Sequence, residues 1–248
     1  MRLDVALVER GLVETRAAAQ RLVMAGLVFS NERRLEKAGQ AVAADTPLEV
    51  RGQLHPYVSR GGLKLEKALD HFAIPVTGRI ALDVGSSTGG FTDCLLQRGA
   101  AKVYAVDVGT NQLAWKLRTD PRVVSMEKTN IRDVTRAEIP DPIDLVVCDG
   151  TFVGLRLVLP AALALAAPGA HLAALIKPQF EVGKGRVGKG GIVREPELHA
   201  EVVETISSWL AAQSGWQVLG VTESPITGAE GNKEFLIAAV LNGAPASP

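Results

Sequence analysis

The sequence predicts an α/β protein built on a doubly wound, Rossmann-like sheet, with a small α/β unit in front of it. Three observations support this fold class. From residue 79 onward, short β-prone runs alternate with segments of helix length, which is the order that produces a mostly parallel sheet covered by helices. The first strand of this series, 80–84, ends in a glycine-rich turn. Residues 1–54 follow a different pattern of two short helices before two short strands.

Length and composition limit the class of protein. A chain of 248 residues with 47% hydrophobic content can bury one sizeable core and a small second module. Basic and acidic residues balance at 27 each, so any RNA contact must come from local patches. Cys94 and Cys148 lie in apolar runs, and they favour a reduced setting without disulfide bonds. Because we find neither a signal peptide core nor a membrane-spanning run, we expect a cytoplasmic protein without membrane contact.

Residues 1–54 are predicted to form the smaller domain. Thr15 is placed to cap its second helix, and Gly26 is placed to terminate that helix. Glycine, proline and polar residues then mark 55–60 as an interdomain linker. The predicted elements are a helix that ends at Gly11, a helix over 16–25, and strands at 28–29 and 48–50.

Residues 61–242 are predicted to form the larger domain, and 243–248 a disordered tail. A helix opens the domain, since apolar residues from Leu65 to Phe72 recur at helical spacing. The predicted strands are 80–84, 102–107, 123–126, 144–149, 171–177, 216–221 and 234–241. The predicted helices between them lie around 91–97, 112–118, 155–166 and 196–213.

The glycine-rich turn after the first of these strands is the predicted cofactor site. In a doubly wound sheet ligands bind at the carboxyl ends of the strands, and glycines let them approach the backbone. The spacing of Gly85, Gly89 and Gly90 after Asp83 differs from the G-x-G-x-x-G pattern of a dinucleotide site. An acidic residue here suits S-adenosylmethionine, which carries cationic groups and no phosphate. The predicted cofactor contacts in this run are Asp83, Gly85, Ser86, Ser87, Thr88, Gly89, Gly90 and Phe91.

Residues at three later strand ends complete the predicted cofactor site. Asp107 ends the second strand, where its carboxylate can accept hydrogen bonds from a ribose diol, and Val108 follows it. Asn130 follows the third strand and is placed to border an adenine. Asp149 ends the fourth strand and is assigned both to the cofactor site and to catalysis. A glycine turn without a ligand and an NAD-dependent enzyme remain as alternatives.

The residues around the end of the fourth strand indicate the methyl acceptor. Amino-group methyltransferases usually place two prolines and an aromatic residue after the acidic one, whereas Gly150-Thr151-Phe152 follow Asp149 here. An amine acceptor is therefore disfavoured. Methylation of a pyrimidine carbon would need a nucleophilic cysteine, for which Cys148 is the candidate near the site. Strand alternation directs Cys148 to the face opposite Asp149, so a core cysteine is favoured and base methylation stays as an alternative.

An alcohol acceptor fits the charged residues at the strand ends better. Because an alcohol has a high pKa, the enzyme needs a base or a cation near the oxygen, and a lysine flanked by carboxylates can serve. Lys177 ends the fifth strand and Glu234 begins the last strand. Lys64 comes from the helix before the first strand. We predict that Lys64, Asp149, Lys177 and Glu234 form the catalytic set and that no metal ion is involved.

The chain resembles the TlyA family over nearly its whole length, a family that joins a small RNA-binding domain to an FtsJ-like ribose methyltransferase. The matching runs are Arg2-Leu3-Asp4, 8–12, 57–65, 83–91, 107–109, 177–185, 224–226 and 231–234. The resemblance implies a class I methyltransferase sheet with an antiparallel last strand. It also implies that the family's Lys-Asp-Lys-Glu tetrad falls on Lys64, Asp149, Lys177 and Glu234.

The resemblance further implies a substrate. The expected reaction is 2′-O-methylation of ribosomal RNA at a cytidine, within a ribosomal subunit, and the large subunit is favoured. Family members commonly follow the fourth-strand Asp with Ser-Phe, and the run Gly150-Thr151-Phe152 departs from this pattern. Some members are called hemolysins, but without a membrane-inserting segment we do not expect pore formation. A ribosome-binding or assembly factor without catalytic turnover is the non-enzymatic alternative.

Basic residues in three segments are the predicted RNA contacts. The N-terminal domain resembles a small RNA-binding motif found in a ribosomal protein, pseudouridine synthases and a tRNA synthetase, and it would direct basic side chains toward phosphates. Others lie beside the linker and in the glycine-rich loop after Lys177. Aromatic residues make up only 4%, which favours recognition of folded RNA by shape over single-strand stacking, and no DNA partner is expected. The predicted contacts are Arg2, Arg16, Arg21, Arg33, Arg34, Arg60, Lys67, Lys184, Arg186 and Lys189.

Overall fold

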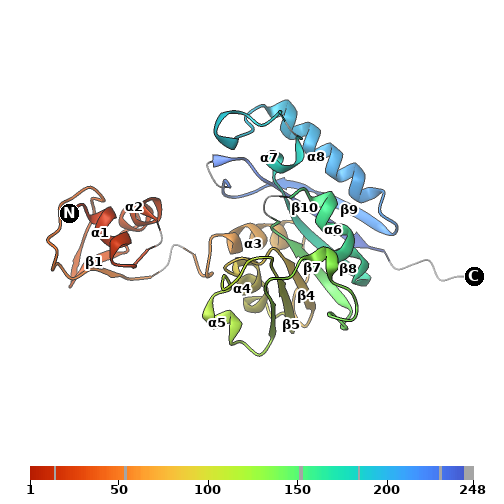
Figure 1. Cartoon of the computed structure of the whole chain (residues 1–248), viewed down its shortest axis with the longest axis horizontal. Coiled ribbons are helices and arrows are strands. Elements are labelled where there is room, and N and C mark those ends of the chain that lie inside the picture. The colour runs from red at the N-terminus through yellow and green to blue at the C-terminus, as the bar shows by residue number, and fades with distance from the viewer. Residues whose placement is uncertain (14, 53–54, 151–152, 184, 229–230, 243–248) are drawn as a thin grey trace, which may run out of the picture. The chain divides into compact units, whose positions relative to one another are not determined.

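The computed structural model contains two compact units, which Figure 1 shows along the chain. It describes all residues except 14, 53–54, 151–152, 184, 229–230 and 243–248, so the predicted tail lies outside the described residues. The smaller unit is Met1–Pro56 and the larger is Tyr57–Pro248. Within the described ranges, every helix falls short of the length and apolarity that crossing a membrane requires.

The smaller unit packs two helices and a short antiparallel sheet around one apolar core. Its elements are α1 (Leu3–Glu9), α2 (Arg16–Met24), β1 (Val28–Ser30), β2 (Arg33–Arg34) and β3 (Glu49–Val50). The Thr15 hydroxyl accepts a hydrogen bond from the Ala18 N–H, and Gly26 after α2 has a φ of +72°, so both predicted helix signals are confirmed. Strand β2 was not predicted, because its two exposed arginines give no apolar signal and it forms through backbone pairing with β1.

The larger unit is built on a seven-stranded sheet in the order β6-β5-β4-β7-β8-β10-β9. The strands are β4 (Ile80–Val84), β5 (Lys102–Val106), β6 (Val123–Met126), β7 (Ile143–Cys148), β8 (Ala166–Ile176), β9 (Trp216–Glu223) and β10 (Phe235–Leu241). Strand β10 runs antiparallel to both of its neighbours, and the other pairs are parallel. The predicted fold class, including its antiparallel last strand, is confirmed.

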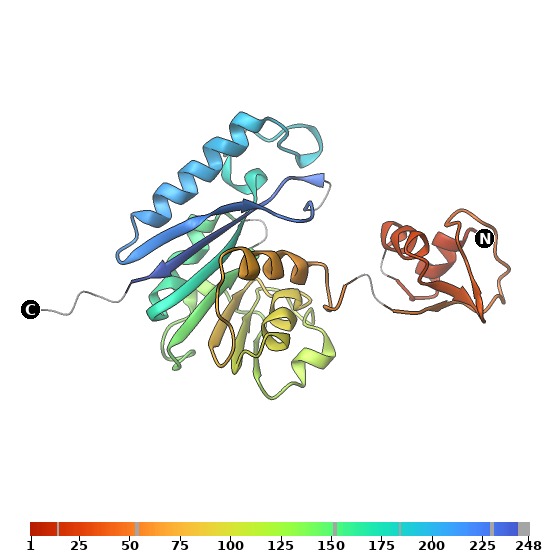
Figure 2. The same cartoon turned by 180° about the vertical axis from the view of Figure 1, so that it is seen from behind.

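Helices cover both faces of this sheet, as Figures 1 and 2 show from opposite sides. The helices are α3 (Gly61–His71), α4 (Gly90–Gln97), α5 (Trp115–Arg118), α6 (Leu155–Ala164), α7 (Pro178–Glu181) and α8 (Pro196–Ala211), with 3-10 turns at Ile131–Asp133 and Lys189–Gly191. Side chains of α3, α4 and α5 share one apolar core with the sheet, and those of α6 and α8 share the other. The carboxyl ends of β4, β5 and β7 therefore meet at the switch point of the sheet, where ligands bind in such folds.

Helix α5 is shorter than the predicted helix over 112–118. The Glu127 carboxylate accepts hydrogen bonds from the backbone N–H groups of Asn111, Gln112 and Leu113 at 3.0, 2.8 and 3.1 Å. These bonds hold the chain in a turn until the helix begins at Trp115. A distant carboxylate therefore sets the start of this helix, and local sequence does not reveal it.

Tyr57 belongs to the core of the larger unit, although we predicted that it lies in the linker 55–60. The Tyr57 side chain is buried, and its hydroxyl donates a hydrogen bond to the Glu66 carboxylate at 2.7 Å. A Cβ added at Gly62 would lie 2.2 Å from the Tyr57 ring. The segment that enters the larger unit thus packs directly on the start of α3.

Candidate active site

The turn between β4 and α4 is packed from two sides. Gly85, Ser87 and Gly89 all have positive φ values, of +78°, +48° and +99°. A Cβ at Gly85 would lie 3.1 Å from the Asp149 carbonyl oxygen, and one at Gly89 would lie 2.3 Å from the Leu117 side chain. The turn therefore needs glycine at both positions, since each combines a left-handed backbone with a close neighbour.

Asp107 joins this turn to the next one. One oxygen of its carboxylate accepts a hydrogen bond from the Ser87 N–H at 2.8 Å, and the other accepts from the Gly109 N–H at 2.7 Å. Val108, which lies between Asp107 and Gly109 in sequence, is 72% exposed. Asp107 thus fixes two loops at the switch point and keeps lone pairs for a ligand.

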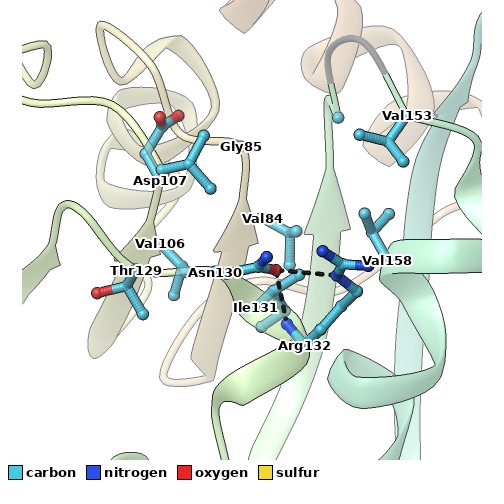
Figure 3. A pocket seen from close by; sticks show the side chains of 12 residues that line it. Val84, Gly85, Val106, Asp107, Thr129, Asn130, Ile131, Arg132, Val153 and Val158 are labelled. Atoms are coloured by element: carbon cyan, nitrogen blue, oxygen red, sulfur yellow. Dashed lines mark hydrogen bonds between the residues drawn. The ribbon is translucent and has the colours of Figure 1, made fainter.

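A cavity opens between these loops and the ends of β4, β5 and β7, and Figure 3 shows its lining. In this view Asp107 lies at one end of the cavity and Val158 at the other. The Asn130 side-chain oxygen accepts hydrogen bonds from the Arg132 backbone N–H and Nε at 3.1 and 3.3 Å. The lining consists of Val84, Gly85, Val106, Asp107, Val108, Thr129, Asn130, Ile131, Arg132, Gly150, Val153 and Val158. It offers an apolar slot with a carboxylate at one end and polar side chains along its length, which suits a nucleoside.

Most apolar residues of this lining were missed by the sequence analysis. Val84 and Val106 come from strands that were predicted correctly, and their position beside the turn could have pointed to them. Ile131 and Arg132 adjoin the predicted Asn130, and the same reasoning could have included them. Val158 lies on α6, and no local signal marks it as part of a ligand site.

Asp83 lies beneath the turn and is absent from the lining of this cavity. Its side chain is fully buried, and it accepts a hydrogen bond from the Thr92 hydroxyl at 2.6 Å. Burial is the main cause that raises the pKa of Asp83 to about 7, and the Asp149 and Asp107 carboxylates also raise it, against the lowering effect of Thr92. Asp83 thus supports the turn through Thr92, and its contact with the cofactor stays a prediction.

Asp83→Asn is expected to remove a pH dependence of stability. Because the folded pKa of about 7 exceeds the ordinary value, protonated Asp83 contributes stability that is fully present below about pH 4 and is lost as the pH rises through 7. The variant should therefore gain stability relative to the wild type between pH 4.5 and 7.5, on the order of a few kcal/mol. Thermal melts of both proteins across this range test it, and a constant difference in melting temperature would contradict it.

Four charged side chains from four elements meet beside the turn. Lys177, after β8, places its Nζ 2.5 Å from Asp149 Oδ1. Lys64, on α3, places its Nζ 3.8 Å from Asp149 Oδ2 and 2.6 Å from Glu234 Oε2. The charges thus alternate from Lys177 through Asp149 and Lys64 to Glu234, and all of these residues are buried except Asp149, whose side chain is 20% exposed. The structure brings together the four residues that the sequence analysis proposed.

A second cavity connects this tetrad to the turn. It is lined by Ser59, Arg60, Gly61, Lys64, Gly85, Ser86, Ser87, Thr88, Gly90, Phe91 and Asp149. It shares Gly85 with the first cavity, so a ligand in one lies next to a ligand in the other. Ser59 and Gly61 were missed, because they lie just before and at the first residue of α3 and reach the turn only through packing, as the position of Ser59 against Gly90 shows.

The backbone next to Glu234, at one end of the tetrad, is held in place by hydrogen bonds of Asn232. Asn232 is buried, and its side chain accepts a hydrogen bond from the Val193 N–H at 3.1 Å and donates one to the Gly191 carbonyl at 3.0 Å. A Cβ at Gly228 would lie 2.1 Å from Glu234 Oε1. The segment before β10 is therefore tied to the end of the glycine-rich loop.

Cys148 faces away from the tetrad. Its side chain is fully buried in the core shared with α6 and α8. Burial raises the pKa of its thiol to about 12. A thiol in this setting is a poor nucleophile.

Two predicted RNA contacts of the smaller unit converge on one buried carboxylate. Arg2 Nε lies 3.0 Å from Asp4 Oδ1, and Arg16 Nη2 lies 3.1 Å from Asp4 Oδ2. The hydrogen bond from Arg2 is the main cause that holds the pKa of Asp4 well below its ordinary value, with further help from Gln20 and Arg16. Both arginine side chains stay more than half exposed, so Asp4 orients them while they remain accessible to a phosphate.

The other predicted RNA contacts are dispersed over both units. Those that are exposed are Arg21, Arg33, Arg34, Arg60, Arg186 and Lys189, and Lys67 is half-buried. Arg34 pairs with Glu36 at 2.6 Å, and Arg186 pairs with Glu201 at 2.5 Å. Lys184 lies outside the described residues, as do Thr151 and Phe152. As RNA contacts, all of these residues remain predictions.

The sheet order and the two joined cavities at the switch point define a Rossmann-fold methyltransferase. An FtsJ-like methyltransferase model matches residues 57–241, and an S4 domain model matches residues 1–46. The chain is 55% identical to the candidate rRNA methyltransferase YqxC of Bacillus subtilis, over 95% of this chain and 84% of that protein. It is 48% identical to the 16S/23S rRNA (cytidine-2′-O)-methyltransferase TlyA of Mycobacterium tuberculosis, over 95% of this chain and 88% of that protein. The chain belongs to the TlyA family of FtsJ-like methyltransferases.

A solved structure agrees with this assignment. A candidate hemolysin from Streptococcus thermophilus is 46% identical to this chain and superposes with a TM-score of 0.77. The match covers 99% of this chain and 90% of that one. The predicted family, fold class and enzyme class are thereby confirmed.

Proposed function

We propose that this protein uses S-adenosylmethionine to methylate the ribose 2′-hydroxyl of a cytidine in ribosomal RNA. The observation that carries the proposal is the largely buried tetrad Lys177, Asp149, Lys64 and Glu234. It lies beside a cavity that shares Gly85 with the first, mostly apolar cavity. A tetrad of alternating charge suits an alcohol acceptor, because it can orient a hydroxyl and stabilise the oxygen as it reacts. The similarity to the Mycobacterium tuberculosis 16S/23S rRNA (cytidine-2′-O)-methyltransferase supports the same reaction.

Residues of both cavities fit the cofactor. Asp107 would accept from the ribose diol, Asn130 would border the adenine, and Ser86 to Thr88 would hold the amino-acid end. When bound, S-adenosylmethionine supplies an electrophilic methyl group on its sulfonium. Because Gly85 lies close to Asp149, the turn that would hold the cofactor lies next to the tetrad.

Residues of the tetrad have distinct proposed tasks. Lys177 acts on the 2′-hydroxyl, and its ion pair with Asp149 fixes the direction of its amine. As an ammonium ion, Lys177 has two more N–H groups with which to orient the acceptor oxygen. Lys64 lies between Asp149 and Glu234 on the wall of the second cavity, where it can position the ribose.

The substrate is proposed to be rRNA within a ribosomal subunit in the cytoplasm, and the large subunit is favoured. The S4 domain supports RNA binding by the smaller unit. The test combines purified protein with labelled S-adenosylmethionine and with each ribosomal subunit in turn. The subunits are prepared from cells that lack this protein. Nuclease digestion and mass spectrometry should then find the methyl group on a cytidine ribose. Label on a base would overturn the proposal, and a lack of cofactor affinity in calorimetry would favour a non-catalytic ribosome-binding factor.

Cys148→Ala is expected to keep methyl transfer within about threefold of the wild type. A mechanism with a cysteine nucleophile would instead lose at least about a thousandfold. The buried position of Cys148 makes a small loss of stability the main expected effect. The rate of methyl transfer to ribosomal subunits decides the question, after calorimetry has shown that the variant still binds the cofactor.

A further inference from the structure

One large apolar side chain beside the site has no role in the proposed chemistry. Trp115, the first residue of α5, is 74% exposed, whereas Trp216 is buried and Trp209 is half-buried. Val108 is similarly exposed, but its exposure is explained because it lines the first cavity. Trp115 is absent from the lining of both cavities of the site. An exposed indole is unfavourable in water, which suggests that a ligand covers it.

Trp115 is anchored at the rim of the second cavity. The N–H of the preceding residue, Ala114, donates a hydrogen bond to the carbonyl of Thr88, which lines that cavity. Leu113 and Leu117, on either side along the chain, pack against Gly89 of the cofactor turn. The indole is thus carried by a backbone segment that contacts the turn directly.

The segment that presents Trp115 is held rigidly. Glu127 fixes the turn before α5 through three backbone N–H groups, and it also pairs with Arg118 at 3.1 Å. Lys116 pairs at 2.9 Å with Asp93, whose side chain is buried on α4. An aromatic side chain on a fixed support loses little conformational freedom when it binds a ligand.

The surroundings of Trp115 favour a nucleobase over an apolar partner. The exposed residues near it in sequence, Asn111, Gln112 and Lys116, are polar, so the segment itself does not form a continuous apolar run of the kind that binds proteins or membranes. Arg60 is exposed on the wall of the adjoining cavity and adds positive charge. An exposed aromatic ring on a segment bonded to a cavity with a basic residue in its wall can stack a base while the cation contacts a phosphate.

We propose that Trp115 is a stacking platform for a nucleobase of the substrate RNA, next to the nucleotide whose ribose enters the second cavity. This inference rests on the proposed function and adds a specificity-determining residue outside the tetrad. Stacking is tolerant of base identity, so Trp115 would hold the RNA strand in place and would not read its sequence.

The test compares Trp115→Ala and Trp115→Phe with the wild type and with Leu219→Ala. Leu219 is also exposed, but it lies on β9, at the opposite edge of the sheet from the β5–β6 edge. Binding of each protein to unmodified ribosomal subunits is measured by co-sedimentation, and methyl transfer is measured as a function of subunit concentration. Trp115→Ala should raise both Kd and KM for the subunits by roughly tenfold, Trp115→Phe should recover most of this loss, and Leu219→Ala should match the wild type.

Several outcomes would overturn the inference. If Trp115→Ala binds subunits as the wild type does, no base stacks on the indole. If Trp115→Ala weakens the binding of both the subunits and S-adenosylhomocysteine, as measured by calorimetry for the latter, Trp115 instead supports the cofactor turn through Ala114 and Thr88. If iodide quenches the fluorescence of the wild type and of Trp115→Phe equally, the indole is already covered in the free protein. A wild type that binds subunits but transfers no methyl group would refute the proposed function, and the binding comparison would still decide the role of Trp115.

Discussion

Replacing Lys177 by alanine is expected to lower the rate of methyl transfer by about a thousandfold or more. The substitution removes the group closest to the acceptor in the proposed mechanism, and it leaves Asp149 without its 2.5 Å partner in a largely buried site. Loss of a positioned acid or base alone costs about 10² to 10⁴ in rate, and misdirection of Asp149 adds to that. Cofactor affinity should stay within about twofold of the wild type, because Lys177 is absent from the first cavity.

The measurement is a single-turnover experiment with saturating ribosomal subunits and labelled cofactor. The matched control is Lys102→Ala, which removes another lysine with a close carboxylate, at 2.6 Å from Asp141, at the start of β5. This end of the strand lies opposite the switch point, so the control should transfer methyl groups at the wild-type rate. Normal methyl transfer by Lys177→Ala would refute the role assigned to Lys177.

Asp107→Ala is expected to weaken cofactor binding by about a hundredfold, which corresponds to about 2.7 kcal/mol. The carboxylate is the proposed acceptor for the ribose diol, and it also holds the Ser87 and Gly109 N–H groups at 2.8 and 2.7 Å. Hydrogen bonds to a charged group contribute about 1.5 to 3 kcal/mol each, so the loss of one ligand contact and a loosened turn together account for the expected change.

Calorimetric titration with S-adenosylhomocysteine measures this effect. Asp120→Ala is a suitable control, because it removes a carboxylate that pairs with Arg122 on the surface at 2.7 Å, outside both cavities of the site. The control should bind the cofactor product as the wild type does. An Asp107→Ala variant with unchanged affinity would place the ribose elsewhere in the cavity.

The sequence predicted the sheet and the tetrad because both depend on regular patterns. Alternating strands and helices define the layers, and charged residues directly after or before strands must collect at one edge of the sheet. Lys177 and Glu234 follow this logic, and the antiparallel direction of β10 brings Glu234 to the same edge as the end of β8. Their positions could therefore be predicted without coordinates.

Features that depend on distant contacts could not be predicted. Glu127 shortens α5 by binding three N–H groups far from it in sequence. Asp83 has the acidic side chain that we predicted for a cofactor contact, but in the structure it is fully buried beneath the turn. Ser59 reaches the cofactor turn only because Tyr57 packs on Gly62. Each of these outcomes is decided by tertiary packing, which short sequence windows do not contain.

The antiparallel insertion of β10 between β8 and β9 also has a consequence for the timing of synthesis. Glu234 and the whole of β10 come near the end of the described chain, yet Glu234 completes the tetrad and β10 occupies an inner position in the sheet. A nascent chain that still lacks them has an open sheet, and its Lys64 lacks the partner that lies at 2.6 Å in the folded protein. The sheet and the tetrad are therefore complete only after residues 234–241 have been synthesised and have folded into place.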